Sequence, residues 1–187
     1  MFTRRLRTRS TWAPDFTQAP PVAPDDVPEG LERAAFAAGC FWGMEEFFLA
    51  VPGVVDAVSG YEGGVVDRPR YEQVCTGRTG HAEAVLVTFD PTRVTFEALL
   101  DAFWRNHDPT TMNRQGPDRG SQYRSAVFVR NEAQAEAARA SLEAVQVRFR
   151  RPIVTEVTPA TTFWPAENYH QRYTERTGRG GCHVANW

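Results

Sequence analysis

The sequence predicts a mixed α/β or α+β fold, and two patterns support that prediction. The first is the order of hydrophobic periodicities, which alternates as strand, helix, strand, strand, helix, strand, helix, strand, helix. The second is the composition, since 42% apolar and 24% charged residues are typical of a soluble globular protein. The net charge of −2 gives no basic field for nucleic acid, and no apolar run approaches the ~18–20 residues that span a membrane.

The domain is expected to begin near Leu31, after an N-terminal extension at 1–30. Residues 13–30 hold five prolines and few aliphatic side chains, so they bury too little apolar surface to fold alone. Residues 1–10 carry four arginines with no apolar stretch after them, which a secretory signal would need. We therefore predict a flexible Arg- and Pro-rich extension at 1–30, with an organelle transit segment as the alternative, and one domain at 31–187.

The first half of the domain is expected to hold three strands and a short helix. The strands are predicted at 32–39, 54–61 and 81–89, and the helix at 44–51. Pro52-Gly53 ends the helix. Residues 62–80 lack either periodicity, and a loop of that length inside a domain is often functional.

The second half alternates between helices and strands. Helices are predicted at 95–107, 131–149 and 165–176, strands at 123–129 and 153–160, and a loop at 108–122. Asn131 is placed to cap the longest helix, and Pro165 occupies the first position of the last one.

Cys40 is the first candidate for chemistry, because it lies between glycine and two aromatic residues where a strand meets a helix. A thiolate near a helix N-terminus has a lowered pKa and a larger reactive fraction. Glu45 and Glu46, which the predicted helix places in its first turn, oppose thiolate formation. On local sequence alone, a nucleophile and a buried structural cysteine both remain open.

Glu83 is the second candidate. In the strand HAEAVLVTF it alternates with Val85, Val87 and Phe89, so the carboxyl group shares a face with three large apolar side chains. Burial among such residues raises the pKa of a carboxyl group and makes it a general acid near neutral pH. The alternative is a strand-end glutamate that turns out to solvent.

Several polar and aromatic residues accompany these two. Phe41 and Trp42 suit either an apolar wall for a small group or ordinary core packing. The phenols of Tyr71 and Tyr123 could donate hydrogen bonds to a developing oxyanion, although packing with a satisfied hydroxyl is the commoner role. Asp118 precedes Tyr123 in a glycine-containing turn.

The cysteine and histidine spacings exclude two kinds of site. The three cysteines, Cys40, Cys75 and Cys182, form neither a disulfide framework nor a C-x-x-C pair, which favours a reducing compartment, provisionally the cytoplasm. The four histidines are too scattered for a zinc site, and no phosphate-binding or dinucleotide motif is present. We expect no metal and no bound organic cofactor.

Five segments in order identify a family resemblance. GCFWGMEE, GYEGG, TGHAEAV, NHDPTT and DRGSQYRSAVF closely resemble the motifs of the peptide methionine sulfoxide reductase A family, over about residues 34–182. The resemblance implies a two-layer α/β sandwich with a mixed sheet and a ferredoxin-like core. It also implies a reductase specific for the S-epimer of methionine sulfoxide, free or in proteins.

The same resemblance assigns roles to residues. It implies that Cys40 attacks the sulfoxide sulfur and that Glu83 protonates the oxygen. Phe41 and Trp42 then surround the substrate methyl group, Tyr71 and Tyr123 hold the oxygen, and Asp118 lies at the rim. These are the catalytic and substrate-binding residues that the family pattern assigns.

Recycling in such enzymes runs through a second cysteine. The resemblance implies that Cys182 resolves the sulfenic acid of Cys40 to a disulfide, which thioredoxin reduces. Two departures bear on this step: Gly180-Gly181 replaces the aromatic residue that many members have before this cysteine, and no further cysteine follows it. Participation of Cys75 stays open, and a monomer is the default expectation.

Three other functions compete with this interpretation. A thiol peroxidase or redox sensor shares the reactive thiol but needs no aromatic wall. A cysteine hydrolase needs a histidine base near Cys40. A non-enzymatic binding module needs neither a reactive thiol nor a histidine base.

Overall fold

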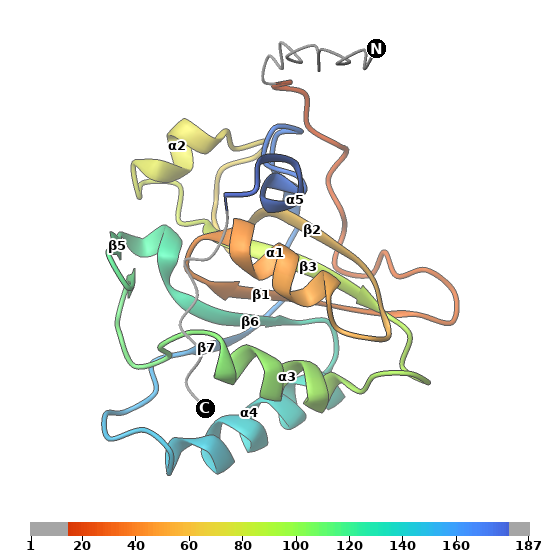
Figure 1. The fold of residues 1–187 in the computed structure, drawn as a ribbon, viewed down its shortest axis with the longest axis vertical. Coiled ribbons are helices and arrows are strands. Elements are labelled where there is room, and N and C mark those ends of the chain that lie inside the picture. Colours follow the sequence, from red (N-terminus) through yellow and green to blue (C-terminus); the bar gives the residue numbers. More distant parts are fainter. Residues whose placement is uncertain (1–14, 180–187) are drawn as a thin grey trace, which may run out of the picture.

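The computed structural model describes residues 15–179, so Cys182 lies outside the described residues. Within them, six strands form one sheet in the order β7-β6-β1-β3-β2-β8 (Figure 1). Their bounds are β1 (Glu32–Ala38), β2 (Val54–Glu62), β3 (Ala82–Phe89), β6 (Ser125–Val129), β7 (Glu156–Pro159) and β8 (Trp164–Pro165). All neighbours are antiparallel except β6 and β7, which makes the sheet mixed, as predicted.

The centre of the sheet has the ferredoxin-like arrangement. Strands β1, β2, β3 and β6 follow one another as β-α-β-β-α-β with α1 (Phe41–Leu49) and α3 (Phe96–Arg105) as the two helices. In space these four strands lie in the order β6-β1-β3-β2. Strand β7 then extends the sheet beside β6, and β8 extends it beside β2.

Three helices cover one face of the sheet, namely α1, α3 and α4 (Glu132–Gln146) (Figure 1). They share one apolar cluster with the alternate residues Val85, Val87 and Phe89 of β3, so the strand periodicity determines which side chains meet the helices. The predicted cap of the longest helix is confirmed, because Asn131 Oδ1 accepts from the Gln134 N–H at 2.9 Å.

The opposite face carries small residues and is covered by extended chain instead of helices. Its cluster contains five alanines together with Leu86, Phe128 and Phe163. Gly60 allows Phe163 to lie close, since a Cβ there would be 2.3 Å from the Phe163 ring. The helices on one face alone give the two-layer architecture.

Residues 15–30, which the sequence assigns to the extension, contact this second face and the chain near Phe163. Val22 and Phe163 exchange two backbone hydrogen bonds of 2.9 Å, and the Asn168 N–H donates to the Thr17 carbonyl at 2.8 Å. The ring of Phe16 packs edge-on against Tyr169 at 5.2 Å. The domain boundary at residue 31 stays a prediction.

Several predicted elements differ from the observed ones. Helix α1 begins at Phe41 instead of Met44. Glu45 and Glu46 therefore lie beyond its first turn, and the prediction that placed them in that turn, opposing a thiolate, is wrong. The predicted loop at 62–80 contains a short helix, α2 (Tyr71–Cys75). The loop at 108–122 contains a hairpin of β4 (Arg114–Gln115) and β5 (Asp118–Arg119), followed by a 3-10 turn.

The prediction of a helix at 165–176 is wrong. Its first residue ends β8, turns follow, and the helix α5 is confined to Tyr173–Thr177. Pro165 lies on an edge strand, where a missing N–H costs no ladder bond. Arg172 adopts the left-handed conformation with φ of 52°, which interrupts helical hydrogen bonding. No helix in the described range 15–179 is long and apolar enough to cross a membrane.

Phe36 joins the sheet to two helices, and its truncation tests this core. The ring is fully buried and lies 4.8 Å from Phe48 and 5.5 Å from Phe103. We expect Phe36→Ala to lower the free energy of unfolding by ~3–5 kcal/mol because it leaves a cavity at this junction. Urea denaturation measures the change, with the exposed Val65→Ala as control; equal effects of the two substitutions would contradict this packing.

Candidate active site

Cys40 follows Gly39 in the short link between the end of β1 and the start of α1. It is the N-cap residue of α1, and its side chain is half-buried. The first peptide N–H groups of the helix are unpaired by the helix itself and give its start a partial positive charge. The structure therefore places the thiol at the positive end of this helix.

Glu83 lies beside the same helix start. Its Oε2 accepts the backbone N–H of Phe41 at 3.2 Å, one peptide unit from Cys40. The side chain is 2% exposed, so the solvent-exposed alternative for this glutamate is excluded. Burial raises the pKa of Glu83 to about 8, and the charge of Asp118 acts in the same direction, while the Phe41 N–H opposes it. The carboxyl group is therefore protonated at neutral pH.

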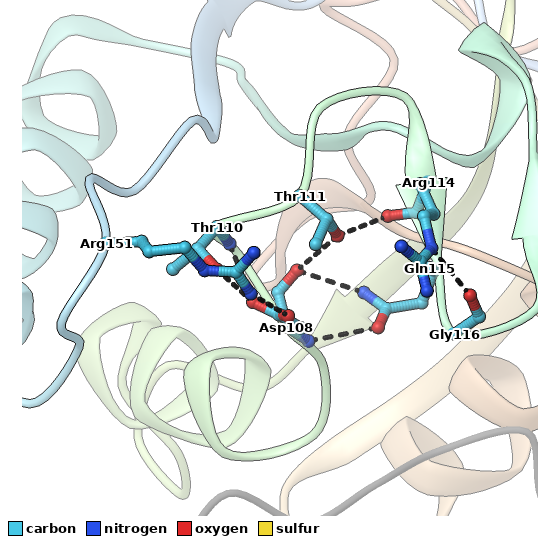
Figure 2. A network of polar contacts seen from close by, with 7 residues as sticks. All are labelled: Asp108, Thr110, Thr111, Arg114, Gln115, Gly116 and Arg151. Atoms are coloured by element: carbon cyan, nitrogen blue, oxygen red, sulfur yellow. Dashed lines mark hydrogen bonds and ion pairs between the residues drawn. The ribbon is translucent and has the colours of Figure 1, made fainter.

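The turn before Cys40 is supported by the network that Figure 2 shows. Gly39 has φ of +89°, and a Cβ there would lie 2.6 Å from the Gln115 side chain. Gln115 is held in place by the backbone of Asp108, since the Asp108 N–H donates to Gln115 Oε1 at 3.1 Å and Gln115 Nε2 donates to the Asp108 carbonyl at 3.2 Å. The Asp108 carboxylate pairs in turn with Arg151 at 3.2 Å. Only glycine fits at residue 39 beside this side chain.

Phe41 and Trp42 differ in exposure. Phe41 is 1% exposed and packs between Tyr61 and His170, with ring centroids 5.9 and 5.1 Å away. Trp42 is half-buried, stacks on Tyr173 at 3.9 Å and donates its indole N–H to His170 Nδ1 at 3.1 Å. Of the two aromatic residues, Trp42 offers the accessible surface.

Tyr71, Tyr123 and Asp118 lie close enough to Glu83 to interact with it electrostatically. Burial raises the pKa of both phenols, and the charge of Glu83 raises them further, so both hydroxyl groups keep their protons. Asp118 is half-buried on β5, and its charge raises the pKa of Glu83 and of Tyr123. The structure thus brings these three residues, from α2, the 3-10 turn and β5, to the acid.

Sequence reasoning missed the residues that hold the aromatic side of the site. Glu167 is buried, and it accepts the Tyr61 hydroxyl and the Tyr71 N–H, both at 3.0 Å. His170 is buried beside it. The i, i+3 spacing of these two residues is visible in the sequence, but their partners lie about 100 or more positions away and give no local pattern.

Cys75 ends α2 and is exposed. Partial burial raises the pKa of its thiol, as does the charge of Glu83, whereas a hydrogen bond with the Tyr71 side chain lowers it. A raised pKa leaves a smaller thiolate fraction. Within residues 15–179, no three His, Cys, Asp or Glu side chains are grouped to hold a metal ion.

The site thus joins a thiol at a helix start, a protonated buried carboxyl group and an accessible indole. Such an arrangement can supply a nucleophile and a proton to one small substrate. Fold and site together define an α/β protein with the layout of a thiol-dependent enzyme.

Comparisons with known proteins specify the family. The family model described as peptide methionine sulfoxide reductase matches residues 32–186. Peptide methionine sulfoxide reductase MsrA of Methanoculleus marisnigri is 59% identical over 156 residues, which are 82% of this chain and 95% of that protein. The chain belongs to the peptide methionine sulfoxide reductase family.

Solved structures agree with this fold. Mxr1 of Saccharomyces cerevisiae in reduced form has a TM-score of 0.80 and 34% identity, over 84% of this chain and 93% of that one. The structure of Mxr1 in complex with Trx2 has a TM-score of 0.59 and 24% identity, over 84% of this chain and 91% of that one, and adds support for the fold alone.

Burial of the Glu83 carboxyl group leads to a prediction about stability. The unfolded chain loses the Glu83 proton near the ordinary pKa of 4.5, whereas the folded chain keeps it to about pH 8. As pH rises from about 4.5 to about 8, ionisation of Glu83 in the unfolded chain therefore lowers the free energy of unfolding of wild type progressively. Glutamine does not ionise and has no such effect. We expect the free energy of unfolding of Glu83→Gln, relative to wild type, to increase across this window.

Urea denaturation at pH 5, 6, 7 and 8 measures this difference. Groups common to both proteins cancel, and Glu46→Gln, an exposed change on α1, is the control. A difference for Glu83→Gln that is independent of pH would show that this carboxyl group ionises normally in the folded protein.

Proposed function

We propose that this protein reduces the S-epimer of methionine sulfoxide to methionine, free or within proteins, with Cys40 as nucleophile and Glu83 as acid. The observation that carries the proposal is the hydrogen bond from the Phe41 N–H to Glu83, which brings a protonated carboxyl group within one peptide unit of the thiol. Membership of the family supplies the substrate class.

In the first step the Cys40 thiolate attacks the sulfoxide sulfur. Glu83 hydrogen-bonds and protonates the oxygen as its bond to the methionine sulfur breaks. The bond that the attack forms between the two sulfur atoms then breaks as the hydroxyl group passes to Cys40, which becomes a sulfenic acid and releases methionine. The methionine sulfur is thereby reduced by two electrons and the cysteine sulfur is oxidised by two. The partial positive charge at the start of α1 favours the thiolate that begins the step.

Five residues bind the substrate in this proposal. Trp42 presents the accessible apolar wall to the methyl group, and buried Phe41 completes it from behind. Tyr71 and Tyr123 donate hydrogen bonds to the oxygen, because their raised pKa values keep both hydroxyls protonated. Asp118 lies at the rim and orients substrate and solvent.

The enzyme returns to its reduced form through thiols. The Cys182 thiol attacks the sulfenic acid, which forms the Cys40–Cys182 disulfide and releases the oxygen as water. The dithiol of thioredoxin then reduces that disulfide by exchange and becomes oxidised itself. That yeast Mxr1 has been solved in complex with Trx2 suggests this class of reductant. A monomer in the cytoplasm remains the expected state.

Separated epimers test the reaction and its recycling. With a thioredoxin system, we expect wild type to turn over only the S-epimer, and Cys182→Ser to stop after about one sulfoxide per enzyme because its sulfenic acid is not resolved. Methionine formed per enzyme is the measured quantity. No reduction of either epimer by wild type would overturn the proposal, and repeated turnover by the variant would move recycling away from Cys182.

The acid role has its own pH signature. Single-turnover rates of wild type should fall as pH rises through about 8, where Glu83 loses the proton that it donates. Glu83→Gln should be slower by ~10²–10⁴-fold and should lack this falling limb, since its amide has no proton to lose. Rapid-quench measurement of methionine from pH 6 to 9.5 checks both, with Glu46→Gln as control. A variant that keeps the alkaline decline would assign that decline to another group.

A further inference from the structure

Two contacts hold the indole of Trp42. One is a hydrogen bond in the plane of the ring, and the other is a stacking contact on its face. Its Nε1–H donates to His170 Nδ1 at 3.1 Å. Its face stacks on Tyr173, with 3.9 Å between ring centroids and 12° between planes. Stacking alone allows the ring to slide or rotate in plane, so the hydrogen bond is the contact that defines its orientation.

The hydrogen bond specifies the state of His170. An indole nitrogen can only donate, so Nδ1 must accept and the neutral ring must carry its proton on Nε2. Burial lowers the pKa of His170 to about 4, and the charge of Arg176 lowers it as well. The imidazole therefore keeps its lone pair on Nδ1 at neutral pH, which is what Trp42 requires.

Glu167 lies beside the other edge of the imidazole. Nε2 of His170 is buried, has no hydrogen-bond partner among residues 15–179, and lies 4.0 Å from Glu167 Oε2, which is too long for a hydrogen bond. Glu167 is itself fixed from two elements, because it accepts the Tyr61 hydroxyl from β2 and the Tyr71 N–H from α2, both at 3.0 Å.

These contacts form a continuous connection from the sheet to the substrate wall. Tyr61 and Tyr71 fix Glu167, Glu167 lies beside His170, and His170 accepts the hydrogen bond that fixes Trp42. The ring of His170 is also enclosed by Tyr169 at 4.0 Å and Tyr71 at 4.5 Å, so it cannot follow a moving indole. A wall fixed in this way has one shape, and its shape limits what fits against it.

We propose that His170 is a positioning residue that fixes the orientation of Trp42 and thereby determines the preference for methyl over larger alkyl sulfoxides. The proposal rests on the proposed function, in which Trp42 contacts the substrate methyl group. One methylene group in an apolar pocket alters kcat/KM by ~10–200-fold when the pocket is rigid. An indole free to rotate adapts to the larger group, and that discrimination is lost.

Two variants separate the hydrogen bond from the bulk of the side chain. His170→Phe keeps a ring but removes the acceptor, and leaves the Trp42 N–H unpaired. His170→Asn is smaller but keeps an acceptor oxygen at the same distance along the side chain as Nδ1. Tyr169→Phe is the matched control, because it keeps the ring that packs on His170 and alters no hydrogen bond of Trp42.

The experiment measures kcat/KM for the S-sulfoxides of methionine and ethionine in all four proteins. We expect wild type, His170→Asn and Tyr169→Phe to prefer the methyl compound by ~10-fold or more, and His170→Phe to lose most of that preference. A wild-type ratio in His170→Phe overturns the proposal. Equal loss in His170→Phe and His170→Asn overturns it too, because bulk and not the acceptor would then matter.

The indole N–H resonance gives a readout that does not depend on turnover. In ¹H–¹⁵N spectra, with the Trp42 cross-peak assigned by Trp42→Phe, we expect the downfield position of a hydrogen-bonded indole in wild type and His170→Asn, and an upfield shift in His170→Phe. The amide spectrum reports whether each variant is folded. If wild type reduces neither sulfoxide, the proposed function fails, while an unshifted cross-peak in His170→Phe rejects the inference separately.

Discussion

The hydrogen bond between the Phe41 N–H and Glu83 is the interaction on which the site depends. A carboxyl group on the apolar face of β3 has no water, so it must find a donor within the protein. The first turn of α1 offers N–H groups that its own helix cannot pair. The bond satisfies both needs, joins residues 42 positions apart, and fixes the start of α1 that follows Cys40. This interaction thus sets the position of the thiol beside the acid, whereas burial keeps the acid protonated against the opposing effect of the same N–H.

The rest of α1 is fixed from the opposite end of the chain. Glu45, buried in its second turn, accepts the Arg172 N–H at 2.7 Å, and burial raises the pKa of this carboxyl group to about 7. Gln171 bonds the backbone of Ser59 through both amide atoms. These bonds hold the chain after β8 against α1 and β2, which is why Tyr173 can stack on Trp42. Arg172 adopts the left-handed conformation, which turns its N–H towards Glu45 and prevents a helix from continuing through this residue.

Sequence periodicity predicted most of the sheet and the long helices, because those elements follow from which side chains are buried. The alternation of Glu83, Val85, Val87 and Phe89 predicted their shared face, and the structure confirms it. It failed at residues 165–176, where a helical pattern is overridden by bonds from Ser59 and Glu45, more than 100 positions away. The start of α1 was misjudged for a related reason, since the bond that stabilises its first N–H comes from β3. Cys40 and Glu83 were recognisable locally, whereas Glu167, His170 and Gln115 act through partners that no local pattern contains.

The two halves of the site are held by different parts of the fold. Burial raises the pKa of Glu83, with Asp118 acting in the same direction, and burial lowers the pKa of His170, with Arg176 acting in the same direction. The acid is anchored in the centre of the sheet, and the indole is anchored by the chain after β8. The two halves share Phe41, whose N–H bonds Glu83 and whose ring packs on His170, and Tyr71, which also packs on His170 and interacts with Glu83. Groups that share partners do not contribute additively, so substitutions at Glu83 and His170 are expected to couple. A change in the indole side of the site therefore reaches the acid through these two shared residues.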